Sequence, residues 1–253
     1  MIKAVIFDMD GLMIDSERIT FEGYQHVLKK MNLTMEEDFY LTLLGKPIPA
    51  IHQSFYEKYG EDFPIEDVIK EVHHYMEQRF INEGVPLKEG LVELLKYLKK
   101  YNYKTIVATS SQRKRVDQIL KSSNLIQYFD DSICGDEVTK GKPNPEVFLK
   151  ACLKLGVDPS ETIVLEDSEA GIQASFSAKI PVICIPDMKY PEEPYASMAT
   201  IMSSLKDVKE YLLLENQDSK PKLKLNYKKT AGIIGTISVI AISSFLAHKY
   251  FKK

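Results

Sequence analysis

Short apolar runs alternate with segments of helical periodicity through much of this chain. Runs typical of buried strands occupy residues 4–7, 105–108, 132–134, 162–165, 182–185 and 200–202. Apolar positions recur at helical spacing in residues 91–101, 112–122, 145–155, 170–177 and 204–214. Strands and helices that alternate in this way are typical of βαβ units. The pattern therefore predicts an α/β fold with a Rossmann-like parallel sheet as its core.

Residues 16–85 interrupt this alternation. Apolar side chains recur there at helical spacing in two stretches, at positions 21, 24, 27, 28 and 31 and again at 68, 72, 75, 76 and 80. We therefore expect a catalytic core made of residues 1–15 and 86–214, with residues 16–85 inserted as an all-helical cap. A cap beside a site can exclude water and close on a substrate.

The end of the chain has a different composition. Residues 215–230 form a basic, polar segment that reads as a linker, and residues 231–248 begin with 17 uncharged residues. As a helix, that stretch would rise about 25 Å, near the lower limit for spanning a bilayer. Because lysines precede it, we expect a C-terminal transmembrane helix that anchors a catalytic domain facing the cytoplasm. A buried or oligomer-packing helix is the alternative, and full-length protein that stays in the supernatant after ultracentrifugation would contradict the anchor.

Charge and cysteine content narrow the functional classes. The net charge is −3, and the eight lysines after Asp218 carry +8, which leaves −11 for the rest of the chain. Such an acidic domain is a poor candidate for non-specific nucleic-acid binding. The three cysteines, Cys134, Cys152 and Cys184, lack metal-site spacing and are expected to be buried free thiols. The first strand starts close to Met1, so we expect no secretory signal and a cytosolic catalytic part.

Two aspartates follow the first predicted strand. They are Asp8 and Asp10 of Asp8-Met9-Asp10-Gly11. A carboxylate at the edge of a sheet can attack phosphorus and form an aspartyl-phosphate. A second carboxylate beside it can act as general acid and base. Aspartate and glycine also build turns and caps, so this motif needs support from the other strand ends.

Hydroxyl and ammonium groups follow two further strands. Thr109 and Ser110 lie where a strand leads into a helix, which is a favourable place for phosphate oxygens, although an ordinary helix cap has the same sequence. Lys142 stands between Gly141 and Pro143, and its ammonium could be a fixed counter-charge for phosphate. A solvated loop lysine is the alternative.

Adjacent acids, Glu166 and Asp167, follow the strand at 162–165. Neighbouring carboxylates repel each other unless a cation lies between them, and carboxylate oxygens suit Mg²⁺. A capping aspartate beside a solvated glutamate is again the alternative for this pair alone. Because parallel sheets bind ligands at the carboxyl ends of their strands, all four fragments should meet at one edge. Together they predict a phosphoryl-transfer site with bound Mg²⁺.

These motifs carry a family resemblance. From Ile2 to about Asp187, the chain resembles the haloacid dehalogenase superfamily of phosphohydrolases, in the branch with a helical cap that includes β-phosphoglucomutase and many sugar-phosphate and nucleotide phosphatases. The segments that match are FDMDGLMIDSER, ATSS, GKPNPEVF and LEDSEAGIQA. The basic linker and the apolar tail lie outside the family pattern.

The resemblance implies a role for each motif. It implies that Asp8 is the nucleophile and Asp10 the acid/base, and that Thr109, together with Lys142, binds phosphate. It also implies Mg²⁺ held by Asp8, by the backbone carbonyl of Asp10 and by Asp167, with help from Glu166.

Within this family, the choice lies between hydrolysis and phosphomutase chemistry. β-Phosphoglucomutase protects its aspartyl-phosphate partly with a histidine in the first cap helix, and Thr20 stands at the matching position here. We therefore expect hydrolysis. Three cap residues, Glu17, Arg18 and Lys46, could reach the substrate, although a solvated position is as good an interpretation for each.

The sequence thus predicts a Mg²⁺-dependent phosphatase that acts on a small phosphorylated metabolite, such as a sugar phosphate, a polyol phosphate or a nucleotide. The alternatives are a phosphomutase and a membrane-tethered binding protein without catalytic activity. The second alternative would be marked by a missing nucleophile or metal ligand, and none is missing. Neither the particular substrate nor the oligomeric state follows from these patterns.

Overall fold

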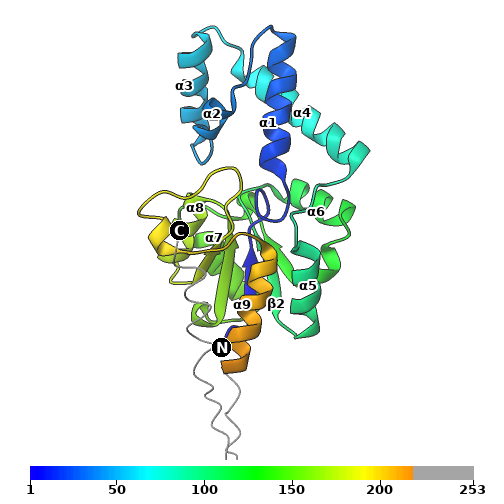
Figure 1. The fold of residues 1–253 in the computed structure, drawn as a ribbon, viewed down its shortest axis with the longest axis vertical. Helices are drawn as coiled ribbons and strands as arrows, with labels where there is room; N and C mark the ends of the chain where they lie inside the picture. Colours follow the sequence, from blue (N-terminus) through cyan, green and yellow to red (C-terminus); the bar gives the residue numbers. More distant parts are fainter. Residues whose placement is uncertain (219–253) are drawn as a thin grey trace, which may run out of the picture. The chain divides into compact units, whose positions relative to one another are not determined.

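The computed structural model describes residues 1–218, which form an α/β fold around one parallel sheet (Figure 1). The sheet has six strands in the order β3-β2-β1-β4-β5-β6, and each neighbouring pair is parallel. The strands are β1 (Ala4–Phe7), β2 (Lys104–Ala108), β3 (Asp131–Ile133), β4 (Thr162–Glu166), β5 (Val182–Cys184) and β6 (Thr200–Ile201). The predicted α/β class with a parallel sheet is confirmed.

The register of the central strands brings the motif residues to one edge. Phe7, the last residue of β1, lies opposite Val107 of β2 and Leu165 of β4. Residues that follow these three positions therefore leave the sheet side by side, at the carboxyl ends of the strands. This is the edge at which open parallel sheets place their ligands.

Helices cover both faces of the sheet. Those of the core are α5 (Leu91–Lys100), α6 (Arg113–Ser122), α7 (Glu146–Leu155), α8 (Glu169–Ser177) and α9 (Leu205–Asp218). Alternate residues of β1 point to opposite faces of the sheet. Val5 and Phe7 pack in one apolar cluster with α5, α6 and α9. Ala4 and Ile6 pack in another cluster with α7 and α8. Burial on both faces explains why the strands read as continuous apolar runs.

The insertion is a helical cap, as predicted. It consists of α1 (Ser16–Lys30), α2 (Glu37–Leu41), α3 (Ile48–Tyr59) and α4 (Ile65–Glu83), which Figure 1 shows as a group of helices beyond one edge of the sheet. The cap has its own apolar cluster, centred on Phe55. Helices α1 and α4 pack closely at Gly23, where an added Cβ would lie 3.0 Å from Val72.

The two chain crossings between core and cap are paired with each other. Ile14 and Leu87 form an antiparallel bridge. The amide of Asp15 donates to the carbonyl of Pro86 at 2.9 Å, and the amide of Lys88 donates to that of Met13 at 2.9 Å. The cap therefore joins the core through two hydrogen-bonded segments, the first of which follows the carboxyl end of β1.

The C-terminal predictions fall largely outside the described residues. Helix α9 continues to Asp218, so the first residues of the predicted linker are helical; no glycine or proline interrupts the chain there. The rest of the linker and the predicted transmembrane helix at 231–248 lie beyond residue 218. Within residues 1–218, no helix has both the length and the apolar character needed to cross a bilayer.

Candidate active site

The edge of the sheet brings Asp8, Lys142 and Glu166 into direct contact. The amide of Asp8 donates to the carbonyl of Leu165 at 3.0 Å, so the backbone of Asp8 continues the pairing of β1 with β4. The Nζ atom of Lys142 lies 2.5 Å from Asp8 Oδ1 and 2.5 Å from Glu166 Oε1. The lysine side chain is only 6% exposed. Three residues far apart in sequence thus form one buried charge cluster.

This cluster continues to a third carboxylate. One carboxylate oxygen from each of Asp8, Glu166 and Asp167 lies within 4.8 Å of the others. Burial raises the pKa of Asp8 to about 8, with Lys142 opposing that rise and Glu166 adding to it. Burial also raises the pKa of Asp167, and the charges of Glu166 and Asp8 raise it further. The negative charge of the three carboxylates is therefore only partly balanced by Lys142.

The donor set fits a hard divalent cation. All three side chains offer carboxylate oxygens, the ligand type that Mg²⁺ prefers, and Mg²⁺ needs few protein ligands because it keeps waters and shares substrate phosphate oxygens. A cation at this point would also lower the raised pKa values of Asp8 and Asp167. The residues present thus match the predicted metal site, although the assignment of individual ligands stays a prediction.

Two glycines make room for the acidic pair. A Cβ on Gly11 would lie 2.1 Å from Asp167 Oδ2, and the backbone there has a φ of +83°. A Cβ on Gly171 would lie 1.9 Å from the Cδ atom of Glu166. Both glycines belong to the motifs that carry the family resemblance, and the close approach of a carboxylate explains each of them.

Glu166 uses its two oxygens differently. Oε1 faces Lys142, whereas Oε2 accepts hydrogen bonds from the amides of Asp167 and Ser168 at 3.0 Å each and from the Ser168 hydroxyl at 2.9 Å. It is fully buried. Glu166 therefore orients both the lysine and the turn that carries Asp167.

Asp10 has different partners from Asp8. Ser111 Oγ donates to Asp10 Oδ2 at 2.7 Å, and the Arg115 guanidinium forms an ion pair with Oδ1. Sequence reasoning assigned no role to Ser111 or Arg115. Ser111 lies just before the start of α6 and Arg115 lies in its first turn, so both follow the carboxyl end of β2, which was the available signal.

Thr109 and Ser110 lie at the same strand edge. Thr109 is buried, and its Oγ1 accepts a hydrogen bond from the Ser111 amide at 3.1 Å. Ser110 is exposed, and its carbonyl oxygen packs so closely on Gly135 that an added Cβ there would lie 2.1 Å away. Their phosphate-binding role stays a prediction.

Lys46 lies apart from this cluster. It is exposed in the loop between α2 and α3, and its Nζ donates to Ser54 Oγ within the cap at 3.0 Å. Its neighbour Gly45 lines the cavity described below, whereas Lys46 is not one of the lining residues that the structure describes. The structure thus gives Lys46 no contact with the charge cluster.

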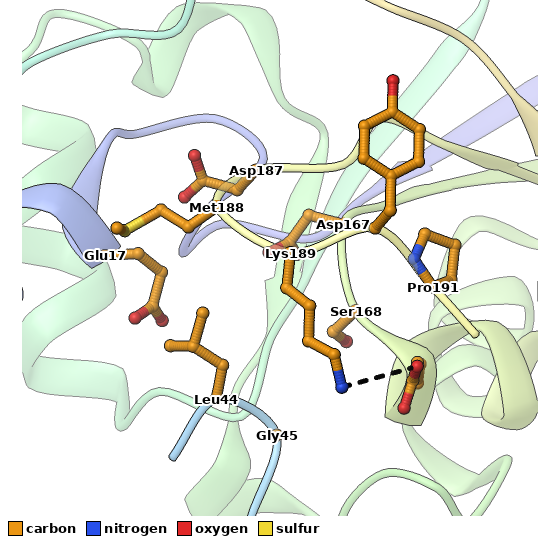
Figure 2. Close-up of a pocket in the computed structure, with 11 residues that line it drawn as sticks. Glu17, Leu44, Gly45, Asp167, Ser168, Asp187, Met188, Lys189 and Pro191 are labelled. Carbon is orange, nitrogen blue, oxygen red and sulfur yellow. Dashed lines mark ion pairs between the residues drawn. The ribbon is translucent and has the colours of Figure 1, made fainter. Parts of the chain in front are cut away.

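A cavity of about 80 Å³ opens beside the cluster, between core and cap (Figure 2). The cap contributes Glu17 from α1 with Leu44 and Gly45, and the core contributes the start of α8 and the loop from Asp187 to Pro191. Asp167 belongs both to this lining and to the charge cluster. The loop after β5 was not predicted to be functional, since it lacks a motif.

Glu17 is the cap residue with a titratable side chain in the described lining of this cavity. The Tyr40 hydroxyl donates to Glu17 Oε2 at 2.7 Å. Burial raises the pKa of Glu17, the Tyr40 hydrogen bond opposes that rise, and the charges of Asp10 and Asp187 add to it. Arg18, by contrast, is exposed and pairs with Asp15 at 3.8 Å.

Comparison with known proteins agrees with this geometry. The family of haloacid dehalogenase-like hydrolases matches residues 5–185. The chain belongs to this family. It is 33% identical over 182 residues to a phosphorylated carbohydrates phosphatase of Thermotoga maritima, an alignment that covers 70% of this chain and 82% of the relative. It is 28% identical over 209 residues to hexitol phosphatase B of Escherichia coli O157:H7, covering 82% and 94%.

A solved structure of the family shares the fold. β-Phosphoglucomutase from Clostridium difficile superposes with a TM-score of 0.66 at 23% identity, covering 86% of this chain and 98% of that one. At this identity, the likeness concerns the fold alone. The family match and the phosphatase relatives confirm the prediction that this haloacid dehalogenase-like hydrolase is a phosphatase.

Proposed function

We propose that this haloacid dehalogenase-like hydrolase is a Mg²⁺-dependent phosphatase that cleaves a small phosphorylated metabolite through an aspartyl-phosphate. The observation that carries the proposal is the position of Asp8, whose carboxylate contacts Lys142 and lies close to that of Asp167, a residue that lines a small cavity. The relatives from T. maritima and E. coli are named as phosphatases of phosphorylated carbohydrates and of hexitols, which supports a small phosphorylated metabolite as the substrate.

In the first step, an Asp8 carboxylate oxygen attacks phosphorus, and the bond from phosphorus to the ester oxygen breaks. Asp10 donates a proton to that leaving oxygen. In the second step, Asp10 accepts a proton from water as the water oxygen attacks the aspartyl-phosphate, which releases phosphate and restores Asp8. Lys142 balances charge on Asp8 and on the phosphoryl oxygens in both steps.

The acidic residues would also hold the metal. Asp8, Asp167 and the Asp10 carbonyl would bind Mg²⁺, with Glu166 orienting the turn behind them. The bound ion would supply charge neutralisation for the phosphate.

Ser111 and Arg115 orient the acid/base. Between them they contact both carboxylate oxygens of Asp10. A proton-transfer group must lie within hydrogen-bond reach of the atom it serves, so these contacts restrict the positions that Asp10 can take. We expect them to be exchanged for contacts with substrate when a phosphate ester binds.

Hydrolysis is favoured over phosphomutase chemistry by the residue at position 20. The Thr20 hydroxyl donates to the Ser16 carbonyl at 2.8 Å and contacts Met76 Sδ at 3.3 Å, so it is engaged within the cap. With β-glucose 1-phosphate as substrate, free glucose would support the phosphatase, whereas glucose 6-phosphate would identify a mutase.

The decisive experiment compares Asp8→Asn with the unmodified chain on a panel of sugar phosphates, polyol phosphates and nucleotides, with Mg²⁺ and with a chelator. Loss of the nucleophile should lower kcat by about 10⁴-fold or more. Asp62→Asn, which alters an exposed aspartate of the cap, is the matched control and should keep full activity. Turnover that survives Asp8→Asn, or that ignores the chelator, would contradict the proposal.

A further inference from the structure

The cavity beside the active site is lined by more acids than bases. Glu17, Asp167, Glu169 and Asp187 contribute carboxylates, and Lys189 contributes an ammonium (Figure 2). These residues come from both cap and core, so the cavity is where the part of the substrate beyond the phosphate would lie.

Two of these carboxylates have a cationic partner. Asp187 forms an ion pair with Lys88, and Glu169 lies 3.9 Å from Lys189, the pair that Figure 2 marks with a dashed line. Asp167 belongs to the proposed cation site. Glu17 differs, because within residues 1–218 no lysine, arginine or histidine nitrogen lies within 4.0 Å of its carboxylate. The charge of Arg115 acts on Glu17 from farther away, so Glu17 lines the cavity without a direct ion pair.

Glu17 is also held in place with one oxygen to spare. Tyr40, which is buried, donates its hydroxyl to Glu17 Oε2 at 2.7 Å, and the same hydroxyl oxygen lies 3.0 Å from the Glu17 carbonyl oxygen. Oε1 has no hydrogen bond to the described part of the chain. A fixed carboxylate oxygen without a donor, on the wall of a cavity, is suited to accept a hydrogen bond from a ligand.

A second free acceptor lies across the cavity. The side chain of Asp187 is 9% exposed, and its Oδ2 is buried without a hydrogen-bond partner in the described residues. The next residue, Met188, packs against the apolar cluster of the cap, so this loop contacts both parts of the molecule. A buried, unpaired carboxylate oxygen is costly unless a donor reaches it.

From this arrangement, we propose that Glu17 is a specificity residue, which accepts a hydrogen bond from a hydroxyl of a neutral, polyhydroxylated leaving group and repels any leaving group that carries a second anion. The inference rests on the proposed function, since it describes the leaving group of that reaction. It assigns a polyol or sugar monophosphate as the substrate class and excludes bisphosphates and phosphorylated carboxylic acids.

Glu17 should favour neutral leaving groups through a hydrogen bond and disfavour anionic ones through charge repulsion. A hydroxyl that donates to Glu17 satisfies a group that otherwise lacks a donor, and sites built around hydrogen bonds discriminate strongly against ligands that cannot make them. A carboxylate or phosphate at the same place would face Glu17 with no cation between them, and such like-charge contact is a common means of rejecting a wrong ligand.

The test uses substrate pairs of similar size in which one member carries an additional carboxylate. Glycerol 3-phosphate and 3-phosphoglycerate form one pair, and glucose 6-phosphate and 6-phosphogluconate form another. With the full chain and Mg²⁺, kcat/KM for the neutral member should exceed that for the anionic member by about tenfold or more. Equal values, or a preference for the anionic members, would overturn the proposal.

Two substitutions separate repulsion from hydrogen bonding. Glu17→Gln removes the charge and should lower the neutral-to-anionic ratio by about tenfold. Glu17→Asp keeps the charge on a shorter side chain, so kcat/KM for the neutral substrates should fall while kcat/KM for the anionic members stays as low as in the unmodified chain. The matched control is Glu77→Gln, an exposed glutamate of the cap outside the cavity lining, which should leave both quantities unchanged.

Failure of this inference can be told apart from failure of the proposed function. If Glu17→Gln hydrolyses both members of each pair with the unmodified ratio, and Asp8→Asn is inactive, then the phosphatase stands and the role of Glu17 is refuted. If Asp8→Asn retains activity, the proposed function itself is wrong. A melting curve for each variant shows whether a change in rate reflects unfolding.

Discussion

The same tripeptide, Gly-Lys-Pro, occurs twice in this chain with different outcomes. In the core, Gly141-Lys142-Pro143 delivers a buried lysine whose ammonium contacts two carboxylates at 2.5 Å. In the cap, Gly45-Lys46-Pro47 delivers an exposed lysine that donates to a serine of the same cap. Local sequence is nearly equal in the two places, so the difference comes from what the tertiary structure places opposite each lysine.

The glycines of the two tripeptides also differ, and here it is the cap copy that has the special requirement. Gly45 has a φ of +76°, a conformation that other residues adopt at a cost, whereas Gly141 has no such backbone angle. Neither glycine has an atom within 4 Å of an added Cβ. The core copy therefore depends on its lysine and the cap copy on its glycine.

The strongest contrast should come from replacing each lysine by methionine. Lys142→Met leaves two buried carboxylates without their cation, which should destabilise the protein by about 3–5 kcal/mol and abolish activity. Lys46→Met removes an exposed contact and should change the free energy of unfolding by about 0.5 kcal/mol or less. Urea unfolding of both variants, with a phosphatase assay, measures the difference.

Excess Mg²⁺ should recover part of the stability lost in Lys142→Met, because a cation can then neutralise the same carboxylates. Equal destabilisation by the two substitutions would mean that the buried ammonium does not balance this cluster, and the comparison between the two tripeptides would fail.

The second prediction concerns metal binding to the core cluster. A cation that binds only the folded state should stabilise it by about 2.7 kcal/mol at a concentration 100 times its Kd. The melting temperature should therefore rise with Mg²⁺ concentration and return to its starting value with a chelator. Asp167→Asn should weaken the response, whereas Lys46→Met should retain it. A melting temperature that ignores Mg²⁺ would argue against the cation site.

The third prediction tests the packing behind Lys142. Gly171→Ala would place a Cβ 1.9 Å from the Cδ atom of Glu166, the partner of Lys142. Overpacking at such a contact typically costs about 1–3 kcal/mol, and displacement of Glu166 should also lower activity. Gly141→Ala, in open space, is the control. A variant at position 171 with unchanged stability and rate would show that Glu166 can move freely.

The smallest effect is expected when the glycine of each tripeptide is replaced by alanine. Gly45→Ala forces a side chain into a left-handed conformation and should cost about 1 kcal/mol, whereas Gly141→Ala should be nearly neutral or slightly stabilising. Thermal melts of the two variants measure the difference. The reverse order would show that strain at residue 45 is relieved by movement of its loop.

The sequence predicted the core better than the cavity for a physical reason. Burial on both sides makes the strands of a parallel sheet continuous apolar runs, so their carboxyl ends can be located, and Asp8 and Glu166 follow such runs directly. Because β1 pairs with β4 so that Phe7 lies opposite Leu165, the residues that follow, Asp8 and Glu166, lie close together. Lys142 follows no strand directly, and its motif was needed to place it.

The remaining site residues depend on contacts that no local pattern encodes. Arg115 lies in a basic stretch of α6 that is equally typical of a solvated helix face, and it reaches Asp10 because α6 packs in the same apolar cluster as β1. The loop from Asp187 to Pro191 follows a short strand without a motif. The importance of Glu17 depends on Tyr40, which lies 23 residues away on another cap helix.

Asp8 lies one residue beyond the end of β1, and its amide donates to the carbonyl of Leu165 in β4. The proposed nucleophile is thus held by a backbone hydrogen bond to the central sheet and not to the inserted helices. A chain built this way has a modular design: the inserted helices could be reshaped, or exchanged for others, to accept a new metabolite while the line of attack on phosphorus stayed the same.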